Sequence, residues 1–283
     1  MDAFLSDIHG NAAALRAVLQ DVQKMGCERI FVLGDIINGM RPAECVDLLQ
    51  AWGSVSCIQG NAEFYTFTPD LDDFPKRDEQ FYADLISLVR WFAAQLSPSQ
   101  LAWVQAAPAY QYLPQAILAH DSPLDRLFPE RHYLPGLAAK YQEVCFHGGG
   151  LSAADSDEAL QPLLEWMDAQ SLQAVFCGHT HVPFTRRLEY KGKEKLICNT
   201  GAAGFPLDGD PRPSWALAQA PEEGDQAGKW QVSIRRVNYD IEEALRAVDK
   251  AVDYPSFQSE PKKRTAYKKM LETGIHWRAH LQE

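Results

Sequence analysis

The feature that most constrains the fold is an alternation of short apolar segments and helix-forming segments near the N-terminus. Ala3–Leu5, Arg29–Leu33 and Val55–Ile58 have the length and apolar character of buried strands. Between the first two, apolar residues recur at helical spacing over residues 15–22, and Pro42 opens a second helix before the third segment. Strand and helix alternating at this spacing predict parallel βαβ units, and therefore an α/β fold.

The rest of the chain predicts further strands and a helical insertion. Residues 64–114 are rich in aromatic side chains and predict two helices, so we expect this stretch to form an insertion or cap. The Lys191-Gly192-Lys193 sequence predicts a hairpin. The expected helices lie at 79–95, 98–106 and 157–170, and the expected strands at 116–119, 143–146, 174–177, 184–190, 194–198, 215–219 and 230–238.

Composition and charge exclude several classes of protein. The 283 residues are 46% hydrophobic, which is enough to bury a sizeable core, and no run of about 18 apolar residues predicts a membrane span. The net charge of -11 argues against a dedicated nucleic-acid binder. The first strand begins almost at Met1 with no secretory leader ahead of it, and the six cysteines show no paired spacing. We therefore expect a cytoplasmic location.

Seven polar residues follow the predicted strands directly, and their types suit metal binding. In an open α/β sheet this is the edge at which ligands bind. Imidazole and carboxylate groups hold pairs of divalent ions, and one carboxylate can bridge both. Asp7 and His9 alternate in one segment, Asp35 is a natural bridge and Asn61 offers a neutral oxygen. The expected metal ligands are Asp7, His9, Asp35, Asn61, His120, His179 and His181.

The motifs that contain these residues resemble those of the calcineurin-like metallophosphoesterase superfamily. They are Asp7-Ile8-His9, Gly34-Asp35, Gly60-Asn61, His120 and Gly178-His179-Thr180-His181, and the later segment 199–204 resembles a loop of its small bacterial and archaeal members. The resemblance implies a four-layer α-β-β-α sandwich of two mixed sheets. It also implies that Asp7, His9 and His181 hold a first ion, that Asn61, His120 and His179 hold a second, and that Asp35 bridges them.

The domain organisation follows from this resemblance and from the predicted elements. We expect a metallophosphoesterase domain over residues 1–238, with the helical insertion at about 64–114. From Ile241 the sequence is typical of helices, so residues 239–283 would form a C-terminal helical extension packed on the same domain. The basic run Lys262-Lys263-Arg264 is typical of a solvated helix face.

Two motifs depart from the pattern of the family. Many members have a histidine after the Gly-Asn pair, but this chain has Ala62, which donates no proton to a leaving group. We therefore expect a preference for anhydrides or activated diesters, and we expect the neighbouring Glu63 to accept a hydrogen bond from a ligand histidine. His120-Asp121 replaces the commoner His-Gly, which leaves His147 as a rival for the same ligand position; we favour His120.

The sequence thus predicts a dinuclear metal-dependent phosphoesterase that hydrolyses a phosphodiester or phosphoanhydride through a metal-bridging hydroxide, with Mn, Fe, Zn or Ni as cofactor. Asp35, Asn61 and His120 are the expected catalytic residues, and Asn61, His147 and Gly201 are expected to contact a small phosphorylated substrate, nucleotides included. One alternative is a protein or nucleotide phosphomonoesterase. Another is a non-catalytic metal-binding scaffold, because a retromer subunit resembles this fold. The oligomeric state stays open.

Overall fold

The first sheet is built around the N-terminal βαβ units. The computed structural model describes residues 1–67, 79–124, 150–222 and 228–281. This sheet has five strands in the order β10-β9-β1-β2-β3. The strands β1 (Asp2–Leu5), β2 (Arg29–Val32) and β3 (Val55–Cys57) are parallel, while β9 (Ser214–Gln219) and β10 (Gln231–Arg236) run antiparallel at one edge.

The second sheet also mixes a parallel centre with antiparallel edges. Its order is β4-β5-β6-β8-β7. The central strands β5 (Ala116–Ala119), β6 (Ala174–Cys177) and β8 (Lys193–Asn199) are parallel. The edge strands are β4 (Tyr110–Leu113) and β7 (Phe184–Tyr190), and the latter forms the predicted hairpin with β8.

Alternation along the strands divides the core into three layers of side chains. Phe4, Phe31 and Phe176 point between the two sheets, and Phe4 stacks on Phe176 with ring centroids 4.2 Å apart. Their strand neighbours point outward, such as Leu5 beneath the helices of the first sheet and Val175 beneath the helix of the second. Because a period of two sends successive residues to opposite faces, both sheets are buried on both sides and need helices outside them.

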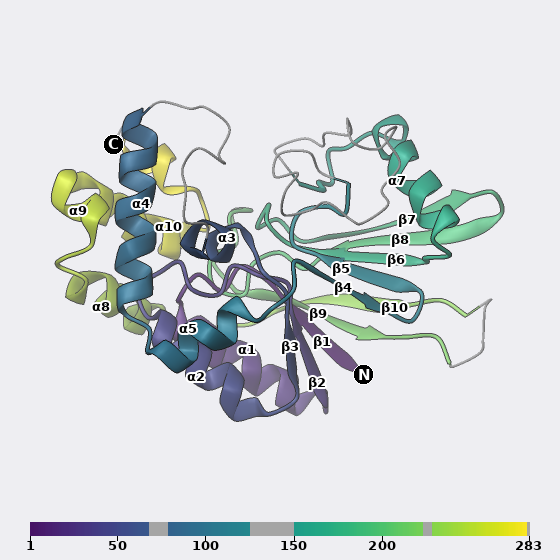
Figure 1. The fold of residues 1–283 in the computed structure, drawn as a ribbon, viewed down its shortest axis with the longest axis horizontal. Coiled ribbons are helices and arrows are strands. Elements are labelled where there is room, and N and C mark those ends of the chain that lie inside the picture. Colours follow the sequence, from purple (N-terminus) through teal and green to yellow (C-terminus); the bar gives the residue numbers. More distant parts are fainter. Residues whose placement is uncertain (68–78, 125–149, 223–227, 282–283) are drawn as a thin grey trace.

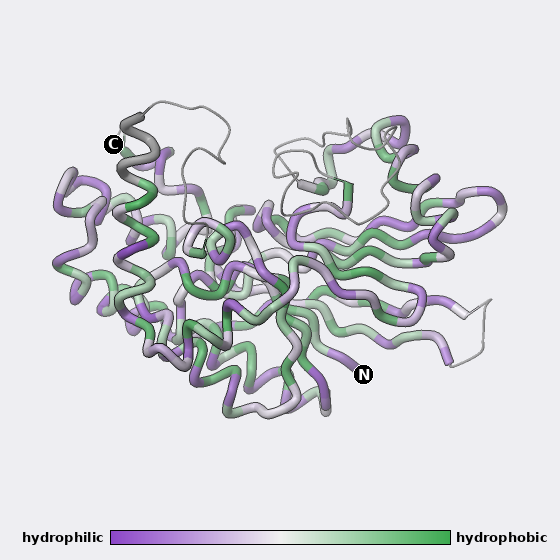
Figure 2. The backbone as a smooth tube through the Cα atoms, viewed as in Figure 1, coloured by the Kyte–Doolittle hydropathy of each residue, from purple (hydrophilic) through white to green (hydrophobic). Residues whose placement is uncertain are grey.

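Helices on the two outer faces complete the predicted four-layer α-β-β-α sandwich (Figure 1). The first sheet is covered by α1 (Ala12–Lys24) and α2 (Pro42–Trp52), with α5 (Pro98–Gln105) packed against α2. The second sheet is covered by α7 (Asp157–Ala169). In Figure 2 the strands form the hydrophobic centre of the molecule, whereas the helices alternate between polar and apolar residues.

The C-terminal residues form helices that pack against α1 and the inserted helix α4 (Glu79–Ala94). They are α8 (Ile241–Lys250), α9 (Pro255–Ser259), α10 (Lys262–Thr273) and the 3-10 helix η4 (Trp277–Leu281). Their shared core includes Ala13 of α1, Phe92 of α4 and Val248 of α8. These helices gather at one end of the sandwich, on the left in Figure 1, beside α3 (Asn61–Phe67) and the carboxyl ends of the parallel strands.

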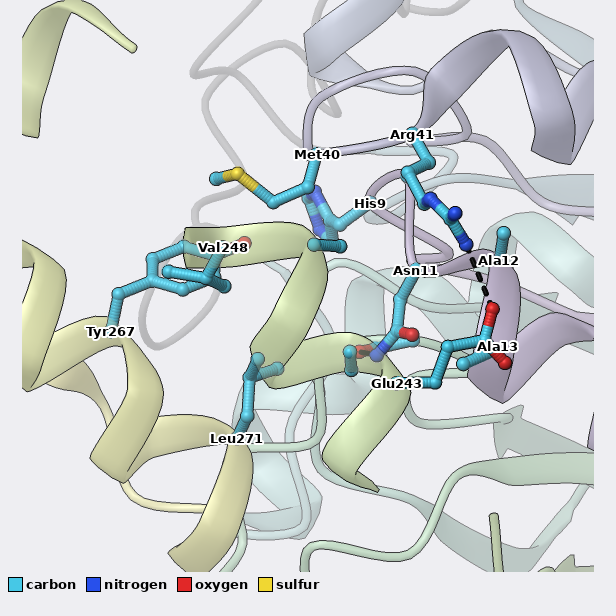
Figure 3. A pocket seen from close by; sticks show the side chains of 14 residues that line it. His9, Asn11, Ala12, Ala13, Met40, Arg41, Glu243, Val248, Tyr267 and Leu271 are labelled. Atoms are coloured by element: carbon cyan, nitrogen blue, oxygen red, sulfur yellow. Dashed lines mark hydrogen bonds and ion pairs between the residues drawn. The ribbon is translucent and has the colours of Figure 1, made fainter. Parts of the chain in front are cut away.

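A polar contact fixes α8 to the sandwich (Figure 3). Glu243 accepts hydrogen bonds from Arg16 of α1 and from Arg41, each at 2.8 Å. The contact borders a small cavity of about 20 Å³ between α1, α8 and α10, lined by His9 and Asn11 among others. This volume is about that of one water molecule, so α8 is packed closely against the sandwich.

The structure differs from the sequence-based expectations at the end of the insertion. Residues 110–113, expected within the helical insertion, form the edge strand β4. The strand has only four residues and lies between Pro108 and Pro114, so its alternation is too short to reveal it in the sequence. The strand expected at 143–146 lies outside the described residues. In the described part of the chain, none of the helices combines the length and the apolar character that crossing a membrane requires.

Candidate metal centre

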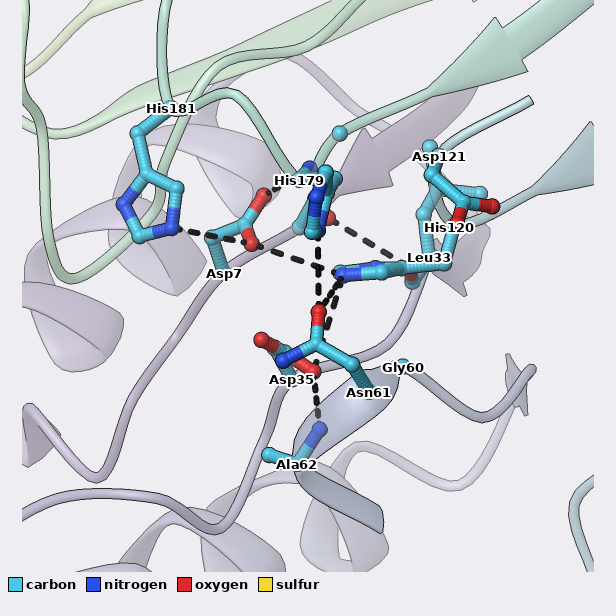
Figure 4. Close-up of polar contacts among 12 residues, drawn as sticks. Asp7, Leu33, Asp35, Gly60, Asn61, Ala62, His120, Asp121, His179 and His181 are labelled. Atoms are coloured by element: carbon cyan, nitrogen blue, oxygen red, sulfur yellow. Dashed lines mark hydrogen bonds and ion pairs between the residues drawn. The ribbon is translucent and has the colours of Figure 1, made fainter. Parts of the chain in front are cut away.

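The seven polar residues singled out by the sequence meet at one end of the sandwich, and Figure 4 shows six of them, all but His9. Asp7 and His9 follow β1, Asp35 follows β2 and Asn61 follows β3 at the start of α3. The second sheet contributes His120 after β5, and His179 and His181 after β6. Because the parallel strands of both sheets end on the same side, residues up to 172 positions apart in the chain lie in hydrogen-bonding contact.

One group of ligand atoms is formed by Asp7, His9 and His181. Asp7 Oδ1 lies 3.4 Å from His181 Nε2 and 3.6 Å from His9 Nε2. The two Nε2 atoms lie 3.2 Å apart. Ligand atoms this close, all from buried side chains, can surround a single cation.

The opposite ring nitrogens of these histidines are already occupied by protein oxygens. His9 Nδ1 lies 2.7 Å from Oδ1 of Asn38, and His181 Nδ1 lies 2.5 Å from the carbonyl oxygen of Phe205. If both Nδ1 atoms donate, both Nε2 atoms present lone pairs to each other. Two lone pairs at that separation repel, so a positive charge, either a proton or a metal ion, is required between them.

The pKa shifts of this pair agree with that requirement. Burial lowers the pKa of both imidazoles, and for His181 it brings the pKa to about 4. For His9 the effect of burial is outweighed by the neighbouring carboxylates of Asp7 and Asp35, which raise its pKa to about 9. At neutral pH these shifts give the pair one positive charge, which His9 holds as a proton in the absence of a metal ion.

A second group of ligand atoms is formed by Asn61, His120 and His179. Asn61 Oδ1 lies 3.1 Å from His120 Nε2 and 2.9 Å from His179 Nδ1. His120 Nδ1 donates to the carbonyl oxygen of Leu33 at 2.6 Å, so its Nε2 presents a lone pair toward the amide oxygen of Asn61. Two acceptors again face each other, and this arrangement too is satisfied by a cation.

Asp35 lies between the two groups. Its Oδ2 is 3.6 Å from His9 Nε2, and its Oδ1 is 3.5 Å from His120 Nε2. Asp35 Oδ1 also accepts a hydrogen bond of 2.8 Å from the backbone N–H of Ala62, which fixes its orientation. A carboxylate with one oxygen toward each group has the geometry of a bridging ligand.

Asp7 provides the clearest test of whether a cation fits this site. The carboxylate is fully buried; its Oδ2 accepts a hydrogen bond of 2.8 Å from the backbone N–H of His179, whereas its Oδ1 has no hydrogen-bond partner among the described residues. Burial raises the pKa of Asp7, but the charges of His181, His120 and His9 outweigh it and hold the pKa far below its usual value. An ionised, unpaired oxygen is costly to bury unless a cation approaches it, so the donor set fits a metal ion.

The backbone of the site is held in a costly conformation. Five of the seven residues have left-handed backbone angles: Asp7, His9, Asp35, His179 and His181, with φ between 46° and 68°. Each such non-glycine residue costs roughly 1–3 kcal/mol and persists only where its surroundings impose it. At Asp7 and His9 the left-handed conformation is held by hydrogen bonds between loops: Asp7 N–H donates to the carbonyl of Gly34, and His9 N–H donates to the carbonyl of Asp35. Strain concentrated in one place indicates a functional site.

Glu63 organises two of the site loops, in a way that corrects the sequence-based prediction. We expected it to accept a hydrogen bond from a ligand histidine. Instead its buried carboxylate accepts from the backbone N–H groups of Asp35, Ile36 and Gly60 at 2.7–2.8 Å. Burial and the charge of Asp35 raise the pKa of Glu63. Glu63 thus ties the loop that carries Asp35 to the loop that precedes Asn61.

A glycine at position 60 is a condition for this arrangement. A Cβ on Gly60 would collide with the backbone nitrogen and the Oδ1 atom of Asp35. The sequence marks this glycine as part of the Gly60-Asn61 motif, but only the structure reveals that the two loops touch there. Any larger residue would separate Asp35 from Glu63.

The three residues predicted to contact substrate are Asn61, His147 and Gly201, of which the structure describes Asn61 and Gly201. Asn61 lines the cleft described below. Gly201 is buried against Pro183 and Ser214, so its position does not support the predicted substrate contact. Its neighbour Asn199 shapes the loop instead, donating to the carbonyl of Gly178 at 2.7 Å. His147 lies outside the described residues.

Three residues that orient ligand histidines could not be identified from the sequence: Asn38, Phe205 and Leu33, whose carbonyl oxygen accepts from His120. Asn38 contacts His9 by its side chain, and Phe205 contacts His181 only by its main chain. Asn38 lies three residues beyond the Gly34-Asp35 motif, with nothing in its spacing to connect it with His9. A main-chain acceptor such as Phe205 carries no signal in residue type at all.

A cleft of about 410 Å³ opens beside the two ligand groups. One side is formed by the site residues His9, Asp35, Asn61, His179 and His181. The other side is formed by α4 and by the C-terminal helices, which contribute Tyr254, Lys263, Tyr267, Trp277 and Arg278. Volumes of this size are typical of sites for small organic ligands.

Comparisons with known proteins agree with the architecture. The protein-family model for the calcineurin-like phosphoesterase superfamily domain matches residues 2–223 of this chain. An uncharacterized protein of Methanocaldococcus jannaschii is 28% identical over 272 residues, which cover 88% of this chain and 92% of that protein. The structure of a metallophosphoesterase from Sphaerobacter thermophilus has a TM-score of 0.58 and 24% identity, covering 88% of this chain and 93% of that one. At that identity the structural match supports the fold alone.

Proposed function

This chain belongs to the calcineurin-like phosphoesterase superfamily, and on that premise we propose that it is a dinuclear metal-dependent hydrolase of phosphodiester or phosphoanhydride bonds. The observation that carries the proposal is the pairing of acceptors with acceptors. His9 faces His181, and His120 faces Asn61, at 3.1–3.2 Å around two buried carboxylates. Positive charge inside this arrangement would satisfy both pairs of acceptors, and the arrangement offers two adjacent places for that charge.

Each ligand group would hold one divalent ion. Asp7, His9 and His181 would hold the first, Asn61, His120 and His179 the second, and Asp35 would bridge both. A donor set rich in imidazole favours Mn, Fe, Zn or Ni over Ca. When bound, the two ions would supply an activated water as the nucleophile and positive charge that offsets the charge developing on the phosphoryl oxygens.

The protein's own residues would position the reaction and set its limits. Asn38 and the carbonyls of Leu33 and Phe205 orient the ligand imidazoles, so the ligand set is fixed before substrate arrives. Ala62 is buried, and its N–H is committed to Asp35. Position 62 therefore supplies no proton to the leaving group, which favours leaving groups that depart as weak bases, such as phosphate or a phenolate.

The remaining parts of the proposal concern substrate, location and domains. The substrate would be a small phosphorylated molecule, nucleotides included, bound in the cleft of about 410 Å³. The described cysteines are free thiols in or beside the core, which is compatible with a cytoplasmic location. We propose residues 1–238 as the catalytic domain and 239–283 as an extension that completes the cleft.

A leaving-group series tests the proposal. Aryl phosphodiesters of decreasing phenol pKa should be hydrolysed at steeply increasing rates by the Mn²⁺-loaded protein, because position 62 provides no general acid. A flat dependence would contradict the assignment of Ala62 and point to a proton donor elsewhere. A protein that binds two metal ions yet hydrolyses no diester, anhydride or monoester would favour the scaffold alternative.

A further inference from the structure

The wall of the cleft opposite the ligand groups carries two cations arranged around one indole ring. Lys263 Nζ lies 5.9 Å and the Arg278 guanidinium 5.4 Å from the ring centroid of Trp277. At such distances the ring face attracts both cations and restricts where they lie. We call Lys263, Trp277 and Arg278 the cationic cluster. It belongs to α10 and η4, beyond the residues matched by the family model.

The structure separates the three basic residues that the sequence presented as one solvated face. Lys262 is exposed, as expected. Arg264 instead lies over the ring of Phe257, 5.4 Å from its centroid. Lys263 lines the cleft, and its side chain is only 24% exposed. The interpretation of the run as a solvated face is therefore wrong for Lys263, which shares a cavity with the ligand groups.

Among the described residues, few groups compete for the charge of the cationic cluster. Within that part of the chain Lys263 has one carboxylate partner, Glu260, at 3.3 Å, and the Glu260 side chain is 46% exposed. A surface pair of this kind contributes little and yields readily to a better-placed anion. Among the described residues Arg278 has no ion-pair partner, and its backbone N–H donates to His276 Nδ1. In a protein of net charge -11, two cations facing a cleft require a reason.

Most of the other residues that line the cleft are apolar or aromatic, with Ser256 and His276 among the polar ones. Tyr254 and Phe257 lie with ring centroids 4.5 Å apart, and Phe205 reaches the same cleft from the loop beside His181. Leu85 and Leu88 of α4 border it as well. A flat apolar group such as a nucleobase suits these surfaces, whereas an inorganic anion alone would leave them uncovered.

From this arrangement we propose that the cationic cluster is a second phosphate-binding subsite, and that the enzyme acts on nucleosides carrying two phosphate groups. The scissile phosphoryl group would lie at the ligand groups, and the second phosphate would bind Lys263 and Arg278 across the cleft. The nucleoside between them would fill the aromatic part. This inference rests on the proposed function and narrows its substrate class.

A matched pair of chromogenic diesters tests the subsite. The p-nitrophenyl ester of thymidine 5′-phosphate and thymidine 3′-phosphate 5′-(p-nitrophenyl phosphate) share leaving group and nucleoside, and differ only in the second phosphate. With the Mn²⁺-loaded full chain, kcat/KM should be about 10-fold higher for the second compound, mainly through KM, as two charge-assisted contacts allow. In the double variant Lys263→Gln with Arg278→Gln this ratio should fall to about 1, whereas Lys262→Gln should keep it.

Equilibrium binding separates failure of the subsite from failure of the proposed function. By calorimetry, thymidine 3′,5′-bisphosphate should bind the Mn²⁺-loaded wild type about 10-fold more tightly than thymidine 5′-phosphate, and the double variant should lose the difference. If neither diester is hydrolysed but this difference is present, the subsite stands and the proposed function falls. If the wild type hydrolyses both diesters equally, or if the double variant keeps the ratio, the subsite is overturned.

Discussion

The two sides of the cleft are built on different principles. The side formed by the strand ends is buried and strained, with Asp7, Asp35 and His120 at most 2% exposed and two of the three in left-handed backbone conformations. The side formed by α10 and η4 is helical, and its cations are partly exposed. A rigid, costly surface suits chemistry that depends on fixed positions, whereas a helical surface with long side chains suits recognition. We therefore expect reaction and selectivity to be separable in this protein.

The largest effect is expected from the bridge between the ligand groups. Asp35→Asn removes the charge that both groups share, so turnover of any substrate should fall by roughly 10³-fold, as when a key charge-stabilising group is lost. Steady-state kinetics on an aryl diester measure this. Asp249→Asn, at an exposed carboxylate paired with Lys268, is the matched control and should retain full activity. Comparable activity in the two variants would contradict the proposal that Asp35 bridges the two metal ions.

An intermediate effect is expected from the residue that ties the site loops together. Glu63→Gln presents an amide N–H₂ group to backbone N–H donors of Asp35, Ile36 or Gly60, leaving a buried donor unpaired at a cost of about 1–3 kcal/mol. Metal affinity should fall about 10–100-fold, as for other residues that orient ligands. Thermal unfolding and metal titration test both effects. Glu28→Gln, at an exposed position, is the control and should change neither the stability nor the metal affinity. If Glu63→Gln also leaves both unchanged, Glu63 is not needed to hold the two loops together.

The smallest effect is expected from the contact that attaches the helical side. Glu243→Gln weakens the bonds to Arg16 and Arg41, which are partly exposed and worth about 1–2 kcal/mol together. KM for the doubly phosphorylated thymidine diester should rise about 2–5-fold, while metal affinity stays at the wild-type value, because the ligand groups do not depend on α8. Equal losses in both quantities would show that the two sides are not separable.

The sequence was sufficient for the strand-end side because its signal is local. Each ligand directly follows an apolar strand, and parallel strands bring their ends together, so Asp7, Asp35 and His179 could be placed near one another without a structure. Their left-handed backbone and the contact of Glu63 with backbone N–H groups could not be predicted. Both depend on loops from different strands touching, and residue types alone do not record that.

The cationic cluster on the helical side of the cleft could not be predicted from the sequence, for a related reason. A basic run on an amphipathic helix predicts a polar face, but not which polar residue faces solvent and which faces a cavity made by other elements. The direction of Lys263 depends on how α8 docks through Glu243 and on where η4 places Trp277 and Arg278. These are tertiary relations over long separations in the chain.

Anomalous X-ray diffraction from crystals of the Mn²⁺-loaded protein tests the central claim most directly. Two manganese peaks are predicted: one among Asp7, His9 and His181, the other among Asn61, His120 and His179, with the Asp35 carboxylate between them. No peak at all, or a single peak whose ligands leave either pair of facing acceptors unfilled, would contradict the account.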